Sequence, residues 1–325
     1  MMREESAGDG DDVEGINATD VQTVNLPSWA LLLKDQSDFL LRAALPVLWT
    51  CLFVILMDRD SFVRFLYMPV LGVFAALLAN CVPIGGGIVY VPILALLGQQ
   101  MNLSVSFAVA TMTVGNGILG FLQWLRKDSS LIVFESFPHT VFPCSLGSAV
   151  GILFLPQSNA WAKMIFGVFS VLVGVYVLLL AYNHVDGAAG AGVGGKSSSP
   201  QSEQQPSPNW LMIQVALFLS GLVLVTNIGV GPALVSFVLL ENAGYSHKQS
   251  MVTGIITGGW VSLVPFLLHL FVTSAGMPLQ LWVMVLPGVY VGAMLAPKVY
   301  ERVGLRSVLA SFGFFLFASA ALFLI

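Results

Sequence analysis

Charged residues are scarce in this sequence. Only 9% of its 325 residues are Asp, Glu, Lys or Arg, whereas 57% are hydrophobic; a soluble domain carries roughly a quarter charged residues. This shortage excludes an ordinary soluble protein. A membrane-spanning helix needs about 20 mostly apolar residues, and the sequence supplies that length repeatedly. The composition therefore predicts an integral, multi-pass membrane protein.

Several kinds of chemical site are missing as well. The three cysteines, Cys51, Cys81 and Cys144, lie in apolar segments without the paired spacings of zinc or redox motifs. No Asp falls inside a predicted span, and neither a His-Glu-x-x-His pattern nor a Walker-type nucleotide-binding loop occurs. The sequence also lacks the basic patches that are typical of nucleic-acid binding. We therefore predict a protein that is not an enzyme, with no catalytic residues, no metal, no cofactor and no nucleic-acid partner.

Long apolar stretches are what the sequence has instead. About nine are long enough to cross a membrane, near residues 39–57, 65–83, 104–125, 133–155, 160–182, 210–227, 247–272, 279–297 and 305–325. Two further apolar pieces, 87–98 and 231–240, would cover only about half of the hydrocarbon thickness. This pattern predicts an all-α fold, a polytopic transmembrane helical bundle of about eight to nine spans that contains two half-length helices.

Composition divides the chain into five parts. Residues 1–38 are acidic and cannot bury enough apolar surface to fold alone, so we expect a disordered tail there. An extra transmembrane helix at 39–57 follows it. Residues 183–209, rich in Gly, Ser, Pro and Gln, indicate a flexible linker. This linker separates a first transmembrane repeat at 58–182 from a second at 210–325.

The two predicted repeats resemble each other in sequence. A shift of 144 residues places Ile84-Gly85-Gly86-Gly87 on Ile228-Gly229-Val230-Gly231. Other positions align too, the first three pairs without a gap: Ser106 with Ser250, Thr113 with Thr257, Gly115 with Gly259, Gly147 with Gly288 and Gly151 with Gly292. An internal duplication explains these matches, although low-complexity apolar sequence also produces chance ones. Each half would then hold a span, a glycine-rich break, a half-length helix and three more spans.

The glycine-rich breaks, 84–87 and 228–231, interrupt apolar segments. Glycine costs about 1 kcal/mol relative to alanine in a helix interior, and irregular backbone at membrane depth must be buried in protein or line a wet cavity. A helix that begins there points unpaired N–H groups and its positive dipole end into the protein. Two such helices would bind an anion without a buried cation, and no predicted span outside 39–57 has a central Lys or Arg. The alternative is that the glycines only allow close helix packing.

The candidate substrate-binding residues are the breaks and the neutral polar side chains near them. From the breaks, they are Gly85, Gly86, Gly87, Gly229, Val230 and Gly231. The polar side chains that could complete an anion shell are Asn80, Asn227, Ser106, Ser250, Thr113 and Thr257, followed by Thr111, Asn116, Thr226 and Thr253. Ser106 and Thr113 are two helical turns apart, so both can face one side. The same hydroxyl groups could instead bond to backbone carbonyls one turn back.

At these residues the chain resembles the TauE/SafE sulfite exporter family. The resemblance rests on NCVPIGGGIVYVPILALLG at 80–98, on SVSFAVATMTVGNGILGF after it, and on TNIGVGPALVSFVLLENAGYSHKQSMVTGIITG in the second half. It covers roughly residues 65–325, with Val230 interrupting the second glycine run. The resemblance implies a polytopic transporter that exports small sulfur-containing or carboxylate anions such as sulfite or sulfonates.

We therefore predict a secondary transporter in the lipid bilayer, an exporter of small anions that works by alternating access around a midplane site. A proton or a sodium ion would be the coupling ion, and His139 and His269 are the candidates for a proton pathway. The alternative is a non-transporting membrane receptor or scaffold, which would bind a ligand without moving it. Charges in the predicted loops do not fix the orientation in the membrane.

Overall fold

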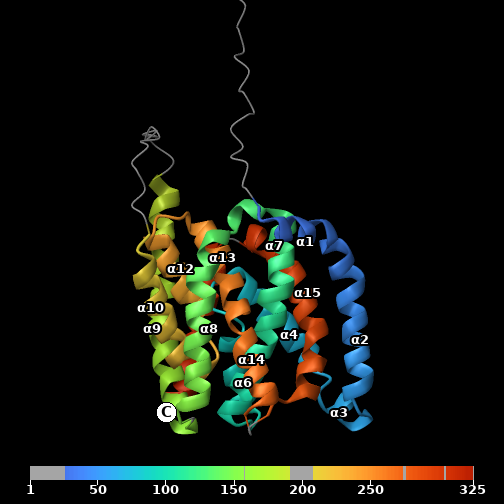
Figure 1. Cartoon of the computed structure of the whole chain (residues 1–325). Helices are drawn as coiled ribbons and strands as arrows, with labels where there is room; N and C mark the ends of the chain where they lie inside the picture. The colour runs from blue at the N-terminus through green and yellow to red at the C-terminus, as the bar shows by residue number, and fades with distance from the viewer. Residues whose placement is uncertain (1–25, 157, 191–207, 274–275, 304, 325) are drawn as a thin grey trace, which may run out of the picture.

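Helices make up the regular structure of the residues that the computed structural model describes, which are 26–156, 158–190, 208–273, 276–303 and 305–324. Seven helical segments are long and apolar enough to cross a membrane: Ser28–Leu56, Met101–Lys127, Ser129–Phe154, Asn159–Leu179, Trp210–Ile228, His247–Phe271 and Leu279–Val299. Four shorter apolar segments accompany them: Met68–Cys81, Gly87–Leu96, Pro232–Asn242 and Leu309–Leu324. Figure 1 shows the helices side by side in one bundle. The all-α, multi-span fold is thus confirmed.

The leading helix starts earlier than the composition suggested. Helix α1 (Ser28–Phe39) continues through a π-helical turn, η1 (Leu40–Ala44), into α2 (Leu45–Leu56). Residues 28–38, which we expected in the disordered tail, are therefore helical, whereas 1–25 lie outside the described residues. Packing explains the difference, because the ring of Trp29 lies 5.7 Å from that of Phe134 and 6.2 Å from that of Trp260.

Helix α4 (Met68–Cys81) is too short to cross a membrane, because its 14 residues extend only about 21 Å. The chain turns at 82–86, and α5 (Gly87–Leu96) then runs back toward the start of α4. Leu97 and Gln99 after α5 line the same hollow as Arg64 and Tyr67 before α4. The stretch 65–83, which we expected to be a full span, is therefore one arm of a re-entrant hairpin. The half-length helix expected at 87–98 is confirmed.

Three long helical segments complete the first half. Helix α6 (Met101–Met112), the π-helix η2 (Thr113–Gly120) and α7 (Phe121–Lys127) form one continuous span. Two short 3-10 turns, η3 (Ser129–Leu131) and η4 (Phe134–Ser136), lead into α8 (Phe137–Phe154). Helix α9 (Asn159–Gly190) follows. Residues 183–190, assigned above to the linker, are thus helical because no proline interrupts the helix there; 191–207 lie outside the described residues.

The described helices resume at Trp210. Helix α10 (Trp210–Ser220), the π-helical turn η5 (Gly221–Val225) and α11 (Thr226–Ile228) form one continuous segment that ends at the second break. Helix α12 (Pro232–Asn242) then runs back along α10, with which it shares an apolar cluster. The remaining helices are α13 (His247–Val261), α14 (Leu263–Phe271), α15 (Leu279–Val303) and α16 (Leu305–Leu324). The half-length helix expected at 231–240 is confirmed as α12.

Two close helix crossings depend on glycines that face backbone carbonyl groups. The glycine–carbonyl pairs are Gly288 with Pro69 and Gly72 with Val285 between α15 and α4, and Gly147 with Phe218 and Gly221 with Cys144 between α8 and the α10–η5 segment. In each pair a methyl group on the glycine would collide with the carbonyl oxygen. Such close backbone contact between helices is typical of small residues in membrane proteins. Gly147 and Gly288 are also aligned in the two halves of the sequence.

Hydrogen bonds between distant segments define the two ends of the bundle. Lys34 of α1 reaches Ser129 at 3.4 Å, and Gln249 of α13 donates to the carbonyl of Ser130 at 3.2 Å. We call this the α7 end, and it is at the top of Figure 1. At the opposite end, the α3 end, Gln280 of α15 donates to Asp58 before α3 (Arg59–Arg64) at 2.7 Å.

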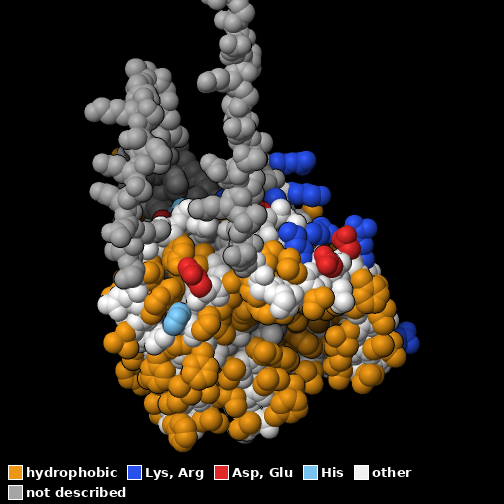
Figure 2. Space-filling model, turned by 45° about the horizontal axis from the view of Figure 1, so that its top comes forward, with side chains coloured by type: hydrophobic (Ala, Val, Ile, Leu, Met, Phe, Trp, Pro, Cys, Tyr) orange, Lys and Arg blue, Asp and Glu red, His pale blue; other side chains and the backbone are white. Residues whose placement is uncertain are grey.

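The surface between the two ends is apolar. Large hydrophobic side chains point outward there, for example Val54, Phe142 and Phe314, which are each about 70% exposed or more. Figure 2 shows hydrophobic side chains covering the sides of the molecule below a group of basic side chains at the α7 end. This surface suits the hydrocarbon of a bilayer, in which exposed apolar side chains carry no penalty.

Candidate functional site

The two glycine-rich breaks lie in contact in the interior. A Cβ atom built on Gly87 would lie 2.5 Å from Cγ1 of Val230 and 3.1 Å from the carbonyl oxygen of Gly229. Helix α6 packs on both breaks, with Ala108 beside Gly87 and Val105 beside Gly229. Residues 82–92 and 228–234 are all buried. Two segments that are 144 residues apart in the sequence therefore form one buried centre.

Glycine is required in both breaks by the backbone conformation. The φ angle is +90° at Gly85, +68° at Gly229 and +115° at Gly231, a region that other L-residues adopt rarely. These turns allow α5 to begin at Gly87 and α12 at Pro232. Proline suits that first helical position because the N–H that it lacks would have no partner there.

The starts of both half-length helices carry main-chain N–H groups without acceptors. Within the described part of the chain, the N–H groups of Gly85, Gly86 and Gly87 form no hydrogen bond, and those of Val230 and Gly231 form none either. Together with the positive ends of two helix dipoles, these groups favour a negative charge. Neither α5 nor α12 contains a Lys or Arg. The centre can therefore attract an anion without a basic side chain.

A small hollow lies beside the first break. Its walls are formed by α4, α5, α6, η2 and α15, and its polar wall residues are Tyr90, Thr111 and Asn116, with Gly86 at the break. The volume of about 10 Å³ is close to what one water molecule needs. Sulfite, with one sulfur and three oxygen atoms, is too large for this space.

Two buried polar atoms in this part of the bundle have no partner, one on Tyr90, which lines the hollow, and one on Asn80, which faces Gly120 of η2. The Tyr90 hydroxyl and the Asn80 Oδ1 atom are buried and form no hydrogen bond among the described residues. An unsatisfied buried polar group costs about 1–3 kcal/mol, so two of them beside an irregular backbone need an explanation. The Asn80 amide nitrogen donates to Ala76 at 2.8 Å, and that of Asn116 donates to Ala79 at 3.4 Å. A bound ligand or water would satisfy the atoms that remain.

Most of the other polar candidates bond to the backbone of their own helix. The donor–carbonyl pairs are Ser106 to Leu103 at 2.9 Å, Thr111 to Phe107 at 2.8 Å, Thr113 to Val109 at 2.9 Å, Thr226 to Gly221 at 3.2 Å and Asn227 to Val223 at 2.8 Å. Thr257 lies 3.5 Å from the hydroxyl of Thr140, and Thr253 accepts the N–H of Val133 at 3.0 Å. Ser250 is buried with an unpartnered hydroxyl. The backbone-bonding alternative thus holds for several of these side chains.

The second break is also closely packed against its neighbours. A Cβ atom on Gly254 of α13 would lie 2.6 Å from the carbonyl oxygen of Ala233 in α12. Under the shift of 144 residues, Leu234 and Trp260 take the places of Tyr90 and Asn116. The second break therefore has no polar counterpart to Tyr90 and Asn116 at these two positions.

Tyr90 is the residue that the sequence reasoning missed. It lies one turn into α5, inside the apolar run IVYVPILAL, where an aromatic side chain indicates core packing. Tyr90 lies three residues after Gly87 and four after Gly86, and residues at that spacing share one helix face. This spacing could have indicated that Tyr90 lies on the same side as the break.

The fold and its centre define a polytopic helical membrane protein in which two broken helices meet in the interior. The model of the family described as sulfite exporter TauE/SafE matches residues 68–323, which is most of the chain. The chain therefore belongs to the sulfite exporter TauE/SafE family, a family of membrane transporters. The match begins at Met68, the first residue of α4, and leaves α1 to α3 outside it. No curated protein and no solved structure matches the chain.

Proposed function

We propose that this chain is a secondary transporter that exports small anions, such as sulfite, sulfonates or related carboxylates, through the centre formed by the two breaks. The observation that carries the proposal is the contact between two buried helix starts, around Gly87 and Val230, with unpaired N–H groups. Each N–H group that bonds to an anionic oxygen contributes about 1.5–3 kcal/mol. The Tyr90 hydroxyl and the Asn116 amide, which line the hollow, would complete the donor set.

Alternating access of the two halves fits the arrangement of the hairpins. The hairpin of α4 and α5 has both ends at the α3 end, and the hairpin of α10 to α12 leads to α13 at the α7 end. Such inverted arrangements around a central site are typical of secondary transporters. Since the hollow has room for about one water molecule, an anion enters only when α4, α5 and η2 move apart.

The energy for transport would come from an ion gradient or the membrane potential, because the sequence has no Walker-type loop. A proton or a sodium ion is the proposed coupling ion. His269 is the better placed of the two histidine candidates, because it is buried with an unpartnered Nε2 atom while its Nδ1 atom lies 3.2 Å from the Thr273 hydroxyl. His139 is instead paired with Gln214 at 2.8 Å.

Flux measurements in proteoliposomes test the proposal. Labelled sulfite, a sulfonate and a carboxylate are compared in one preparation, and we expect saturable flux of at least one. Gly86→Leu and Gly231→Leu should abolish it, because both place a large side chain at the start of a half-length helix. Unchanged flux in both variants would reject the site, and saturable binding without flux would favour the receptor alternative.

The Tyr90→Phe variant separates binding from folding. Removing a buried hydroxyl that has no partner should leave the thermal stability unchanged or raised. If this hydroxyl binds the anion, KM should increase about tenfold or more, because the variant loses one hydrogen bond to a charged group. Ser170→Ala is the matched control, because Ser170 in α9 also carries a buried, unpartnered hydroxyl. Equal KM values in both variants would remove Tyr90 from the site.

A further inference from the structure

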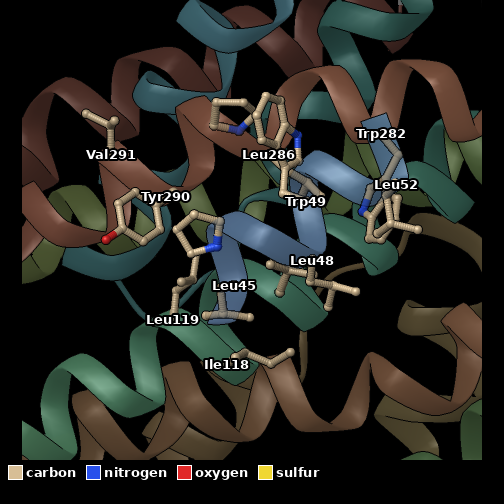
Figure 3. A pocket seen from close by; sticks show the side chains of 13 residues that line it. Leu45, Leu48, Trp49, Leu52, Ile118, Leu119, Trp282, Leu286, Tyr290 and Val291 are labelled. Atoms are coloured by element: carbon tan, nitrogen blue, oxygen red, sulfur yellow. The ribbon is translucent and has the colours of Figure 1, made fainter. Parts of the chain in front are cut away.

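A large apolar pocket separates the leading helix from the rest of the bundle. Figure 3 shows Leu48, Trp49 and Leu52 of α2 on one side, with Leu286 and Tyr290 of α15 across from them. Ile118 and Leu119 of η2 close the pocket. Its volume is about 360 Å³, within the size range of ligand sites.

Two of the three polar atoms on the aromatic side chains that line this pocket are bonded, and the third, Nε1 of Trp282, is buried with no hydrogen-bond partner among the described residues. The Trp49 indole N–H donates to the carbonyl of Val283 at 2.8 Å, and the Tyr290 hydroxyl donates to the carbonyl of Leu41 at 2.9 Å. These two bonds fasten the leading helix to its surroundings at two levels, and the other side chains that line the space, apart from Trp282, are aliphatic or proline. An occupant must therefore be apolar over the length of the pocket.

The pocket opens on the part of the surface that faces hydrocarbon. Leu48, Ile118 and Val291 line it and are also exposed, at 56%, 38% and 44%. In a bilayer, the apolar groups next to such an opening are acyl chains. Acyl chains of the surrounding bilayer can therefore enter the pocket through this opening.

A positive charge stands at the α7 end of the pocket. Arg42 lies about one helical turn before Pro46, which lines the pocket, and its side chain is 76% exposed. Its acidic neighbour Asp38 is 3.7 Å away but is held by Arg126 at 2.5 Å. The Nε atom of Arg42 pairs with Asp38, so the terminal nitrogens of its guanidinium group are the ones that would meet a phosphate group, which Arg binds well.

We propose that an anionic phospholipid binds between α2 and α15, with an acyl chain in the apolar pocket and its phosphate group on Arg42. This lipid also supports the centre of the protein, because residues of η2 line both the apolar pocket and the polar hollow. Ile118 and Leu119 face the lipid pocket, and Asn116 faces the polar hollow. The lipid thereby fixes the position of η2 beside Tyr90.

Photolabelling of the full-length protein in nanodiscs tests the proposal. The probe is phosphatidylglycerol with a diazirine in the middle of one acyl chain, and phosphatidylcholine with the same label is the comparison. We expect the phosphatidylglycerol label on peptides of α2, η2 and α15, several-fold stronger than the phosphatidylcholine label. Leu48→Trp, which fills the pocket, should reduce the labelling several-fold. Val47→Trp is the matched control, since Val47 is the next residue of α2, is 62% exposed and does not line the pocket.

Arg42→Gln tests the head group separately. It should lower phosphatidylglycerol labelling to the level of phosphatidylcholine. Equal labelling in Leu48→Trp and Val47→Trp would overturn the pocket as the binding site, and equal labelling by the two lipids in the unchanged protein would overturn an anionic lipid. Absence of labelling on α2, η2 and α15 by either lipid would overturn a lipid occupant. The labelling does not measure flux, so its failure leaves the proposed transport function intact.

Discussion

Gly117 of η2 and Gly259 of α13 touch backbone to backbone. A Cβ atom on Gly259 would collide with the main-chain nitrogen of Gly117, and the indole of the next residue, Trp260, donates to the carbonyl of Gly117 at 2.8 Å. The contact joins the two parts of the chain one residue away from Asn116, which lines the polar hollow. Any movement of one half against the other must therefore change the packing next to the proposed site.

The two adjacent glycines at the start of α5 should differ in their tolerance of a methyl group. Gly87→Ala would bring a Cβ atom within 2.5 Å of Val230, whereas the nearest atom to a Cβ on Gly86 is a ring carbon of Tyr90 at 3.3 Å. We expect Gly87→Ala to lower the free energy of unfolding by about 1–3 kcal/mol through overpacking, and Gly86→Ala to change it much less. Thermal denaturation in detergent measures both. Equal stability of the two variants would contradict the contact between the breaks.

The two glycine crossings should respond alike to substitution. In Gly147→Ala and in Gly288→Ala, the new methyl group meets a backbone carbonyl oxygen, of Phe218 and of Pro69 respectively. Because backbone cannot move aside as a side chain can, we expect each variant to lose about 1–3 kcal/mol or more of stability. Unfolding measurements on the pair provide the check. A large loss in one variant and none in the other would argue against equivalent crossings in the two halves.

The distribution of basic side chains predicts the orientation in the membrane. The α7 end carries Lys34, Arg42, Arg126, Lys127, Lys248, Lys298 and Arg302, whereas Arg59, Arg64 and Lys163 lie toward the α3 end. Because cytoplasmic loops carry an excess of Lys and Arg, we expect the α7 end to face the cytoplasm. This prediction needed the structure, since the re-entrant hairpin decides at which end each loop falls.

Cysteine accessibility checks that orientation. In a background without the exposed Cys51, we expect a membrane-impermeant maleimide to label Lys163→Cys in intact cells. Lys248→Cys should react only after the cells are opened. The opposite pattern would reverse the orientation.

Asp58 should stabilise the connection between the leading helix and α15 in a pH-dependent way. The pKa of Asp58 is lowered, mainly because its carboxylate accepts the Ser61 N–H, with a further hydrogen bond from the Gln280 amide. A lowered pKa in the folded state means that the stabilisation is present above the unfolded pKa of about 3.9 and is lost as the pH falls through the folded value. Asp58→Asn should therefore lower the melting temperature at pH 7, and the difference should shrink below about pH 3.9.

Asp60→Asn is the control for that experiment. It removes the same charge from α3 without removing the capping side chain, which belongs to Asp58. A melting temperature that falls equally in both variants, or a difference for Asp58→Asn that does not change with pH, would show that the hydrogen bonds of the Asp58 carboxylate do not set its effect.

The half-length helices could be predicted from local sequence. Residues 87–98 and 231–240 were expected, and α5 and α12 occupy Gly87–Leu96 and Pro232–Asn242. The prediction succeeded because the signals are local: the glycines weaken a helix where they stand, and the apolar run that follows has a length that can be counted. The family resemblance, which rested on the same stretches, is confirmed by the match over 68–323.

The expected polar shell could be predicted only in part. Thr113 and Ser106 had the right chemistry and spacing. Each hydroxyl group instead bonds to a carbonyl oxygen one turn back in its own helix, which requires no further part of the chain to become ordered. Asn80 likewise bonds to Ala76 in its own helix, whereas Asn116 lines the hollow beside the first break together with Tyr90. Which polar groups stay unpaired depends on neighbours that are distant in sequence, so the repeat alone could not select them.

The sequence by itself determined the membrane class, the places where the helices break and the family, because hydrophobic length, glycine and proline act within a few residues of their own position. Only the tertiary structure decided that α4 and α5 fold back as a hairpin, that Gly87 meets Val230, and that α2 stands away from α15 around a pocket. These features depend on which helices pack together, and packing is set by the shapes of surfaces that the chain brings together only when it is folded.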